Sequence, residues 1–259
     1  YNLYFSKERA GMITRLATSL VLNYLRKWDV TSSKRVDKFV AISRYIAERI
    51  KKNYGRDSDL IYPPVDCSYF KPGFANDGFY LMVSPLAPNK RVDIAVEAFN
   101  SIDLPLIVIG SGQEEKKLEK MAGKNIKLMG WQSDEIVREH YVNCKALIFP
   151  GVEDFGIVPL EAQACGKPVI AFGEGGALET IVPLDKNIGN SNATGLFFYE
   201  QTAESLANAV ARFEDVQGQF NCQAIRGNAE LFDRAIFKDR IKEYIDKKYK
   251  EFRRDLQDK

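Results

Sequence analysis

Histidine is nearly absent from this chain: among 259 residues there is only one, His140. Histidine-based catalytic triads and most zinc-hydrolase sites need this side chain as a base or a metal ligand. The pattern around His140 predicts an amphipathic helix, in which the ring is expected to be structural. The composition therefore nearly excludes serine-hydrolase and zinc-hydrolase chemistry.

The four cysteines include no close pair. They are Cys67, Cys144, Cys165 and Cys222. This spacing predicts neither a zinc site nor a redox dithiol. Reduced, buried cysteines in a cytosolic protein are the simplest explanation, so we expect a cytoplasmic protein with no bound metal.

Strong net charge and long apolar runs are also missing. The net charge is +2, from 37 basic and 35 acidic residues, which argues against nucleic acid as the main partner. No apolar run reaches the length of a membrane span, and we expect no signal peptide. The hydrophobic content of 45% and the charged content of 28% are typical of a soluble globular protein.

From residue 79 onward, short apolar runs alternate with amphipathic segments, a pattern typical of βα units. Strands are expected over residues 79–83, 106–109, 126–129, 146–149 and 169–172, with 195–198 as a further candidate. Helices are expected over residues 91–100, 114–121, 134–143, 159–165 and 202–213. The strands are almost continuously apolar, which favours a sheet buried on both faces. The predicted fold is therefore α/β: a Rossmann-like parallel sheet flanked by helices.

The first 62 residues lack a complete βαβ pattern. The expected elements are a basic and aromatic helix over 1–28, a strand over 36–42, a helix over 43–52 and a short strand over 59–62. We interpret residues 1–62 as the end of a second α/β domain, most of which would lie upstream. Prolines and glycine predict a stiff linker over 63–77. The main domain would then span 78–233. Residues 234–259 would form a long charged helix, and the first domain is a candidate for the surface to which it crosses back.

Every unusual loop follows a predicted strand. Ligands of a doubly wound sheet bind outside the carboxyl ends of its strands, so these loops should face one crevice. The loops are 84–90, 110–112, 130–131, 153–161 and 173–176.

Two glutamates, Glu153 and Glu161, stand with seven residues between them in the fourth of these loops. Gly156 interrupts the segment, and Pro159 suits the first turn of a helix. We therefore expect a helix that opens near Pro159, with Glu161 in its first turn and free backbone N–H groups at the crevice. The alternative is that Glu161 only stabilises the helix end and Glu153 is a solvated loop residue.

Lys90 and Arg91 open a predicted helix, where positive charge opposes the helix dipole. A bound anion would remove that penalty and make the site a phosphate cradle. The alternative is that both side chains extend into water.

Three other loop features are ambiguous alone. Gly110 and Gly112 match a fragment of a dinucleotide fingerprint, although a tight turn also explains them. Trp131 could stack on a base or a sugar, whereas an aromatic residue at such a place more often packs. The glycines of 173–176 would allow a ligand close to the following helix, or would form a flexible loop.

Together these residues resemble the retaining GT-B glycosyltransferases of family 4. The resemblance rests on the glutamate pair, on 164–171, and on 83–93, 110–112 and 173–176, which match the family's donor-binding half. Residues 37–43 and 61–66 resemble the end of its first domain and the interdomain linker. The match covers almost the whole chain, and the mannosyltransferase-like group of polysaccharide and lipopolysaccharide assembly is the most similar.

The resemblance implies a nucleotide-sugar donor, with GDP-mannose favoured over a UDP-sugar, and no obligatory metal. It implies transfer of a hexose with retention to a glycan or lipid-linked acceptor. It leaves open peripheral association with the inner face of the membrane through the first domain, and the oligomeric state. In the front-face mechanism proposed for this family, the leaving phosphate accepts the acceptor's proton, so no protein nucleophile is required.

The resemblance also implies residue roles. Glu153 would contact the transferred sugar and Lys90 would neutralise the diphosphate, which makes them the expected catalytic residues. Glu161 would hydrogen-bond the ribose hydroxyls. The other expected donor-binding residues are Ser84, Arg91, Gly110, Gly112, Trp131, Phe155, Gly156 and Ile157.

One departure from the family concerns the diphosphate. Ser84-Pro85-Leu86 stands where the family usually carries Gly-Arg-Leu, so Lys90, helped by Arg91, would bear the diphosphate charge. Three rival functions are a glycosidase using the two glutamates, a GT-B epimerase and a non-catalytic nucleotide-sugar-binding module. The lysine loop argues against the first rival, and the scarcity of acid–base groups argues against the second.

Overall fold

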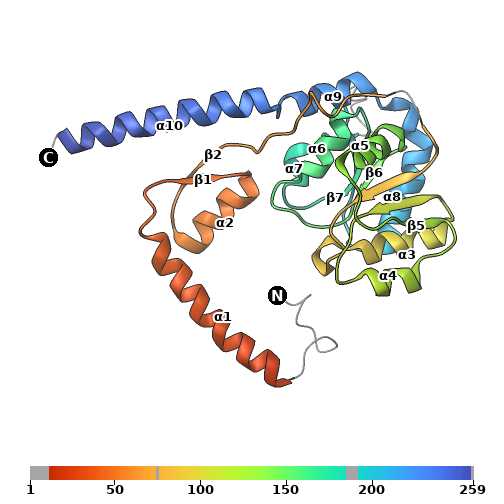
Figure 1. Ribbon diagram of the computed structural model, residues 1–259, viewed down its shortest axis with the longest axis horizontal. Helices are drawn as coiled ribbons and strands as arrows, with labels where there is room; N and C mark the ends of the chain where they lie inside the picture. Colours follow the sequence, from red (N-terminus) through yellow and green to blue (C-terminus); the bar gives the residue numbers. More distant parts are fainter. Residues whose placement is uncertain (1–11, 74–75, 185–191, 258–259) are drawn as a thin grey trace.

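The structure is a computed structural model that describes residues 12–73, 76–184 and 192–257. The long helix α10 (Arg234–Gln257) extends away from the α/β domain, and the long helix α1 (Met12–Ser33) lies on the other side of residues 39–60 from it (Figure 1). The predicted segments at 1–11 and 258–259, and positions 74–75 of the predicted linker, lie outside the described residues. No helix in the described part is both long and apolar enough to cross a membrane.

The α/β domain is built on a six-stranded parallel sheet with the order β5-β4-β3-β6-β7-β8. The strands are β3 (Tyr80–Val83), β4 (Leu106–Ile109), β5 (Ile126–Leu128), β6 (Leu147–Phe149), β7 (Val169–Phe172) and β8 (Gly195–Phe198). The predicted parallel sheet is confirmed, and the candidate strand at 195–198 is its edge. Because the chain builds outward from β3 to one edge and from β6 to the other, the strand order reverses between β3 and β6. Ligands bind at such a switch point.

Helices cover both faces of this sheet. They are α3 (Val92–Ile102), α4 (Glu115–Met121), α5 (Asp134–Asn143), α6 (Ile157–Ala164), α7 (Ala177–Thr180), α8 (Ala203–Val216) and α9 (Cys222–Glu230), with short 3-10 turns η1 (Pro88–Lys90) and η2 (Gln217–Gln219). Alternate residues of β3 separate into two cores: Tyr80 packs with α3 and α8, whereas Leu81 packs with α5 and α6. The predicted burial on both faces is confirmed.

Helix α6 begins two residues before the predicted start at Pro159. Gly156, at φ +93°, turns the chain directly into the helix, a conformation that glycine adopts without steric cost. Pro159 is then the third helical residue, where its missing N–H would have had no partner within the helix. Glu161 therefore does not lie in the first turn, and its interpretation as a first-turn acid is wrong.

The N-terminal unit comprises α1, β1 (Phe39–Ala41), α2 (Arg44–Tyr54) and β2 (Ser58–Leu60), with β1 and β2 paired in parallel. The first strand is shorter than the predicted 36–42. The reason is that Arg56 Nη2 donates to the carbonyl oxygens of Val36 and Asp37, each at 3.0 Å, so these groups have a partner other than a strand. Helix α10 contacts β2 through Asp59, which accepts a hydrogen bond from Tyr244 at 3.1 Å. The predicted domain boundaries stay a prediction.

Three of the four cysteines are buried, namely Cys67, Cys144 and Cys165, whereas Cys222 is only partly buried. Burial raises the pKa of each of the three buried thiols to about 12. A thiol with so high a pKa is a poor nucleophile and metal ligand at neutral pH. These three residues therefore act as small apolar core side chains.

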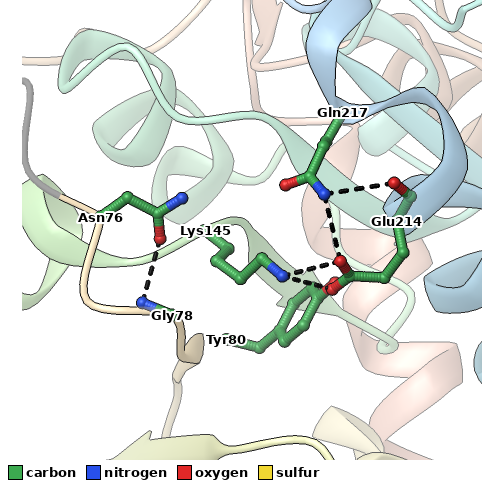
Figure 2. Close-up of polar contacts among 6 residues, drawn as sticks. All are labelled: Asn76, Gly78, Tyr80, Lys145, Glu214 and Gln217. Atoms are coloured by element: carbon green, nitrogen blue, oxygen red, sulfur yellow. Dashed lines mark hydrogen bonds and ion pairs between the residues drawn. The ribbon is translucent and has the colours of Figure 1, made fainter.

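A polar network lies at the amino ends of β3 and β6, at the sheet edge opposite the switch point. Lys145 Nζ donates to both carboxylate oxygens of Glu214, at 2.6 and 2.7 Å, and Figure 2 shows this pair beside Tyr80 and Gln217. The Tyr80 hydroxyl and the Gln217 amide also donate to Glu214. Burial would raise the pKa of Glu214, but the hydrogen bonds from Lys145 and Tyr80 and the lysine charge outweigh it, so this pKa is lowered.

Replacing Lys145 with methionine is expected to destabilise the protein by about 2 kcal/mol, because it leaves the half-buried Glu214 without its cation. A carboxyl group with a lowered pKa stabilises the fold above its usual titration range, and this contribution is lost as the pH falls through the folded-state pKa. The difference between wild type and Lys145→Met in urea unfolding should therefore shrink below about pH 4. An equal difference at pH 7 and pH 3 would contradict the ionic explanation.

Candidate functional site

Two pockets adjoin at the carboxyl ends of β3 and β6. The first, of about 310 Å³, contains Lys90 and Glu153 and is called the lysine pocket. The second, of about 340 Å³, contains Trp131 and Glu161 and is called the tryptophan pocket. The residues that line both pockets are Val83, Ser84, Pro85 and Val158. Four of the five predicted loops therefore meet at the switch point in a bipartite cavity, whereas no residue of the fifth loop, 173–176, lines either pocket.

The lysine pocket brings together residues from the loops after β3 and β6. Lys90 Nζ donates to Glu153 Oε1, and each side chain is 23% exposed. Gly151 allows this contact because a Cβ there would lie 3.0 Å from the carbonyl oxygen of Asn89. The charges of Lys90 and Glu153 partly neutralise each other, and an anion entering the pocket would share the lysine.

The first turn of α6 forms another wall of the lysine pocket, with Gly156, Ile157 and Val158 among its lining residues. Gly156, the N-cap, has no side chain to cap the helix. Backbone N–H groups in the first turn of a helix lack partners within it, and the helix dipole adds positive potential there. The pocket thus combines a lysine with a helix N-terminus, two features that suit a phosphate group.

Phe155 contributes differently from its neighbours. Its ring is 2% exposed and stacks on Tyr62, with ring centroids 5.5 Å apart. Its side chain is therefore unavailable to a ligand in the pocket, and only its backbone remains for the predicted role.

Glu161 lines the tryptophan pocket and is held in one orientation by a hydrogen bond from Tyr141. The Tyr141 hydroxyl donates to Glu161 Oε2 at 2.9 Å, and Tyr141 is fully buried. Burial raises the pKa of the Glu161 carboxyl even though this hydrogen bond lowers it. One carboxyl oxygen is thus held by Tyr141, while Glu161 lines the same cavity as Trp131, which is 76% exposed. Packing in a core does not explain Trp131.

The two glycines of the loop after β4 permit close contact between loops. A Cβ on Gly110 would lie 1.9 Å from the carbonyl oxygen of Ser84, and one on Gly112 would lie 2.6 Å from that of Leu86. Gly110 lines the tryptophan pocket, whereas Gly112 is not among the lining residues of either pocket. Their tight turns serve to join the loops after β3 and β4.

Arg91 does not accompany Lys90 into the pocket. It lies at φ +54° before α3, and its guanidinium donates to Asp93 at 3.2 Å and to Gln201 at 2.9 Å. Gln201 in turn donates to the Pro150 carbonyl oxygen at 2.9 Å. The prediction that Arg91 helps Lys90 carry a diphosphate is therefore not supported, because this network directs its side chain elsewhere.

Sequence reasoning missed four residues that shape the site. Ile42 and Pro63, from the N-terminal unit and the linker, line the lysine pocket, while Tyr141 and Gln201 hold Glu161 and Arg91. Buried tyrosine and loop glutamine carry no local signal that could have singled them out. Among the described residues there is no cluster of three or more His, Cys, Asp or Glu side chains suited to a metal ion.

The fold and the cavity define a Rossmann-like domain of the GT-B type. HepE from Anabaena, solved in complex with UDP and glucose, superposes with a TM-score of 0.71 at 21% identity, over 85% of this chain and 66% of that one. Sucrose-phosphate synthase of Thermosynechococcus elongatus gives a TM-score of 0.69 at 22% identity, over 82% and 58%.

Residues 69–230 match the family model for glycosyl transferases group 1, and the chain belongs to this family. An uncharacterized glycosyltransferase of Methanocaldococcus jannaschii is 34% identical over 175 residues, 64% of this chain and 48% of that protein. The alpha-1,3/1,6-mannosyltransferase of Saccharomyces cerevisiae is 27% identical over 243 residues, 73% and 48%. A GDP-mannose-dependent phosphatidylinositol monomannoside mannosyltransferase of Corynebacterium glutamicum is 29% identical over 212 residues, 70% and 53%. The chain thus spans about half the length of these curated relatives.

Proposed function

We propose that the chain binds a nucleotide-sugar donor across the two adjoining pockets, and that the protein transfers a hexose from it to a glycan or lipid-linked acceptor with retention of configuration. The observation that carries the proposal is the position of Lys90 and the α6 N-terminus beside a second cavity that contains Glu161 and Trp131. A charged phosphate site next to a partly apolar pocket suits a nucleoside diphosphate. Such a protein would work in the cytoplasm, where nucleotide sugars are made, with peripheral membrane contact left open.

Each part of the donor has a place in this arrangement. The diphosphate would lie against Lys90 and the first-turn N–H groups of α6, and the sugar would lie beside Glu153. The ribose hydroxyls would donate to the Glu161 oxygen that Tyr141 does not hold, and the base would stack on Trp131. Electrostatic stabilisation of the leaving diphosphate is then the largest catalytic contribution, and its oxygen would take the acceptor's proton.

The donor we favour is GDP-mannose. Two of the relatives described above are named as mannosyltransferases, one of them as GDP-mannose-dependent, whereas the HepE structure holds UDP. A thermal-shift series with GDP-, UDP- and ADP-sugars tests this choice. A ligand at 100 times its Kd adds about 2.7 kcal/mol of stability, which raises the Tm by several degrees in a chain of this size. If no nucleoside diphosphate or nucleotide sugar raises the Tm, the proposal fails.

A nucleotide-sugar-binding module without transfer is the second candidate. The observation that favours it is Pro85, which lines both pockets and brings neither positive charge nor a backbone N–H to the diphosphate. Donor binding without release of nucleoside diphosphate in the presence of any acceptor would support this candidate. Formation of a glycosylated product would exclude it.

Glu161 gives a prediction that is specific to the ribose. Glu161→Ala should weaken nucleoside diphosphate binding about tenfold or more, since a hydrogen bond to a charged group contributes about 1.5–3 kcal/mol. The wild type should bind GDP more tightly than 2′,3′-dideoxy-GDP, and Glu161→Ala should bind both equally. Calorimetry with the two nucleotides measures this preference. A preference that survives the substitution would place the ribose elsewhere.

A further inference from the structure

Glu179, on the short helix α7, contacts the N-terminal unit at three points. Its Oε2 accepts hydrogen bonds from the Arg44 backbone N–H and from the Tyr62 hydroxyl, both at 2.9 Å. Its Oε1 accepts from the Tyr45 backbone N–H at 3.1 Å. One carboxylate of the α/β domain therefore holds both the start of α2 and Tyr62, the residue before the predicted linker.

This contact completes the capping of α2. Ser43, the N-cap, accepts from the Ile46 N–H at 3.0 Å, and Glu179 accepts from the two N–H groups that Ser43 leaves. A negative charge at a helix N-terminus is also favoured by the helix dipole. Glu179 is thus a helix cap supplied from a residue 135 positions away from Arg44 in the chain.

Two further contacts join the same unit to the loop that carries Glu153. Tyr62 stacks on Phe155 with an interplanar angle of 23°, and Arg49 pairs with Asp154 at 2.8 Å. The helix that carries Glu179 is itself attached to this loop, because the Gly176 N–H donates to the Glu153 carbonyl oxygen at 2.8 Å. The loop and α7 therefore form one support for the N-terminal unit.

The residues next to these contacts line the lysine pocket. Ile42 precedes the N-cap Ser43, and Pro63 follows Tyr62, and both belong to the pocket wall. Releasing α2 and Tyr62 from Glu179 would let this wall move away from Glu153. The tryptophan pocket has no lining residue from the N-terminal unit and only Phe70 from the linker. Lys90 and the first turn of α6, which would hold the diphosphate, belong to the α/β domain. We therefore expect binding of the nucleotide itself to be unaffected.

We propose that Glu179 is a positioning residue that holds Ile42 and Pro63 against the lysine pocket and thereby sets the affinity for the sugar of the donor, while leaving that for the nucleotide unchanged. This inference rests on the proposed function for its ligand, and on the three hydrogen bonds of Glu179 for its geometry. Glu179 acts through the pocket wall and does not itself line either pocket.

The test compares GDP with GDP-mannose, or the base and sugar that the thermal-shift series selects. Calorimetry gives the ratio of the two Kd values for wild type, Glu179→Gln and Glu179→Ala. We expect the ratio of the Kd of GDP to the Kd of GDP-mannose to fall at least fivefold in Glu179→Ala. The ratio should fall less in Glu179→Gln, which keeps one acceptor oxygen. The Kd of GDP should stay within twofold. Glu204→Gln, an exposed glutamate in the first turn of α8, is the matched control and should change neither value.

Hydrogen exchange supplies a readout that needs no ligand. The backbone amides of Arg44 and Tyr45 should exchange faster in Glu179→Ala. A second variant, Tyr62→Phe, keeps the ring stack, and it should lower the ratio of the two Kd values with little effect on folding. The proposal would be overturned if exchange in Glu179→Ala were unchanged, or if exchange became faster while the ratio of the two Kd values stayed the same. It would also be overturned if the wild type bound GDP and GDP-mannose equally. If the wild type binds no nucleotide, the proposed function fails, while exchange still decides whether Glu179 holds α2.

Discussion

Lys90→Met is expected to weaken nucleoside diphosphate binding about 10- to 100-fold. The physical reason is the loss of a charge-assisted hydrogen bond, which contributes about 1.5–3 kcal/mol, where 1.4 kcal/mol is a factor of ten in Kd. The loss should be larger than for an isolated lysine, because Glu153 would then face the diphosphate without its cation. Calorimetry with GDP and UDP measures the change.

Substitution of Glu153, the partner of Lys90, should not weaken nucleoside diphosphate binding. Glu153→Gln removes the carboxylate that competes with the diphosphate for Lys90, so nucleoside diphosphate should bind as tightly as in wild type or more tightly. Transfer should nevertheless fall, because the residue beside the sugar has lost its charge. A double-mutant cycle of the two substitutions measures their coupling.

The control for this pair is Lys120→Met, which removes an exposed lysine from α4, away from both pockets. It should leave the Kd unchanged, and so exclude a general effect of net charge. If the explanation is ionic, added salt should lower the affinity of the wild type for nucleoside diphosphate, and it should lower the affinity of Lys90→Met less. If Lys90→Met binds nucleoside diphosphate like wild type, the phosphates do not lie at Lys90.

The second large effect is expected from Gly176→Ala, which should destabilise the protein by about 3 kcal/mol and abolish measurable donor binding. A Cβ at this position would lie 2.2 Å from the Phe155 Cα and 2.4 Å from its carbonyl oxygen. These are backbone atoms, which cannot rotate away, so the cost lies at the upper end of that for an overfilled core. The loop that carries Glu153 would have to move.

Backbone strain cannot explain this effect, because Gly176 has φ −66° and ψ −19°, values that alanine adopts freely. The matched control is Gly227→Ala in α9, where a Cβ meets nothing within 4 Å. There alanine should stabilise the protein by about 0.5–1 kcal/mol, as expected within a helix. Urea unfolding of both variants provides the comparison. Equal stability of Gly176→Ala and wild type would show that the two loops are not in contact in solution.

Much of the fold was predictable because its strands are short, apolar and regularly spaced. The pattern placed the strands at 79–83 and 169–172 to within a residue, and the helix at 134–143 to both of its ends. The boundary at Pro159 was wrong because Gly156, at a positive φ, starts the helix earlier. A rule about proline could not anticipate that conformation.

The candidate site was predictable as a set of loops but less so as a set of contacts. Lys90 and Glu153 do meet in one pocket. Arg91 follows Lys90 in the sequence, but its side chain is held by Asp93 and Gln201. Glu161 lines the second pocket, where the buried Tyr141 holds its carboxyl group. Which way a side chain points from a loop depends on partners far away in the chain, and these have no local pattern.

The sequence by itself determined that this chain forms a parallel α/β sheet and that its glycine, lysine and glutamate loops all follow strands, because periodicity and the handedness of βα units are local properties. Only the tertiary structure decided that β3 and β6 are neighbours, that two pockets separate Glu153 from Glu161, and that Glu179 caps α2. These features depend on strand order and on contacts between segments more than 60 residues apart. Such contacts form because burial of apolar surface in the folded chain selects one packing among many, and no short stretch of sequence encodes that choice.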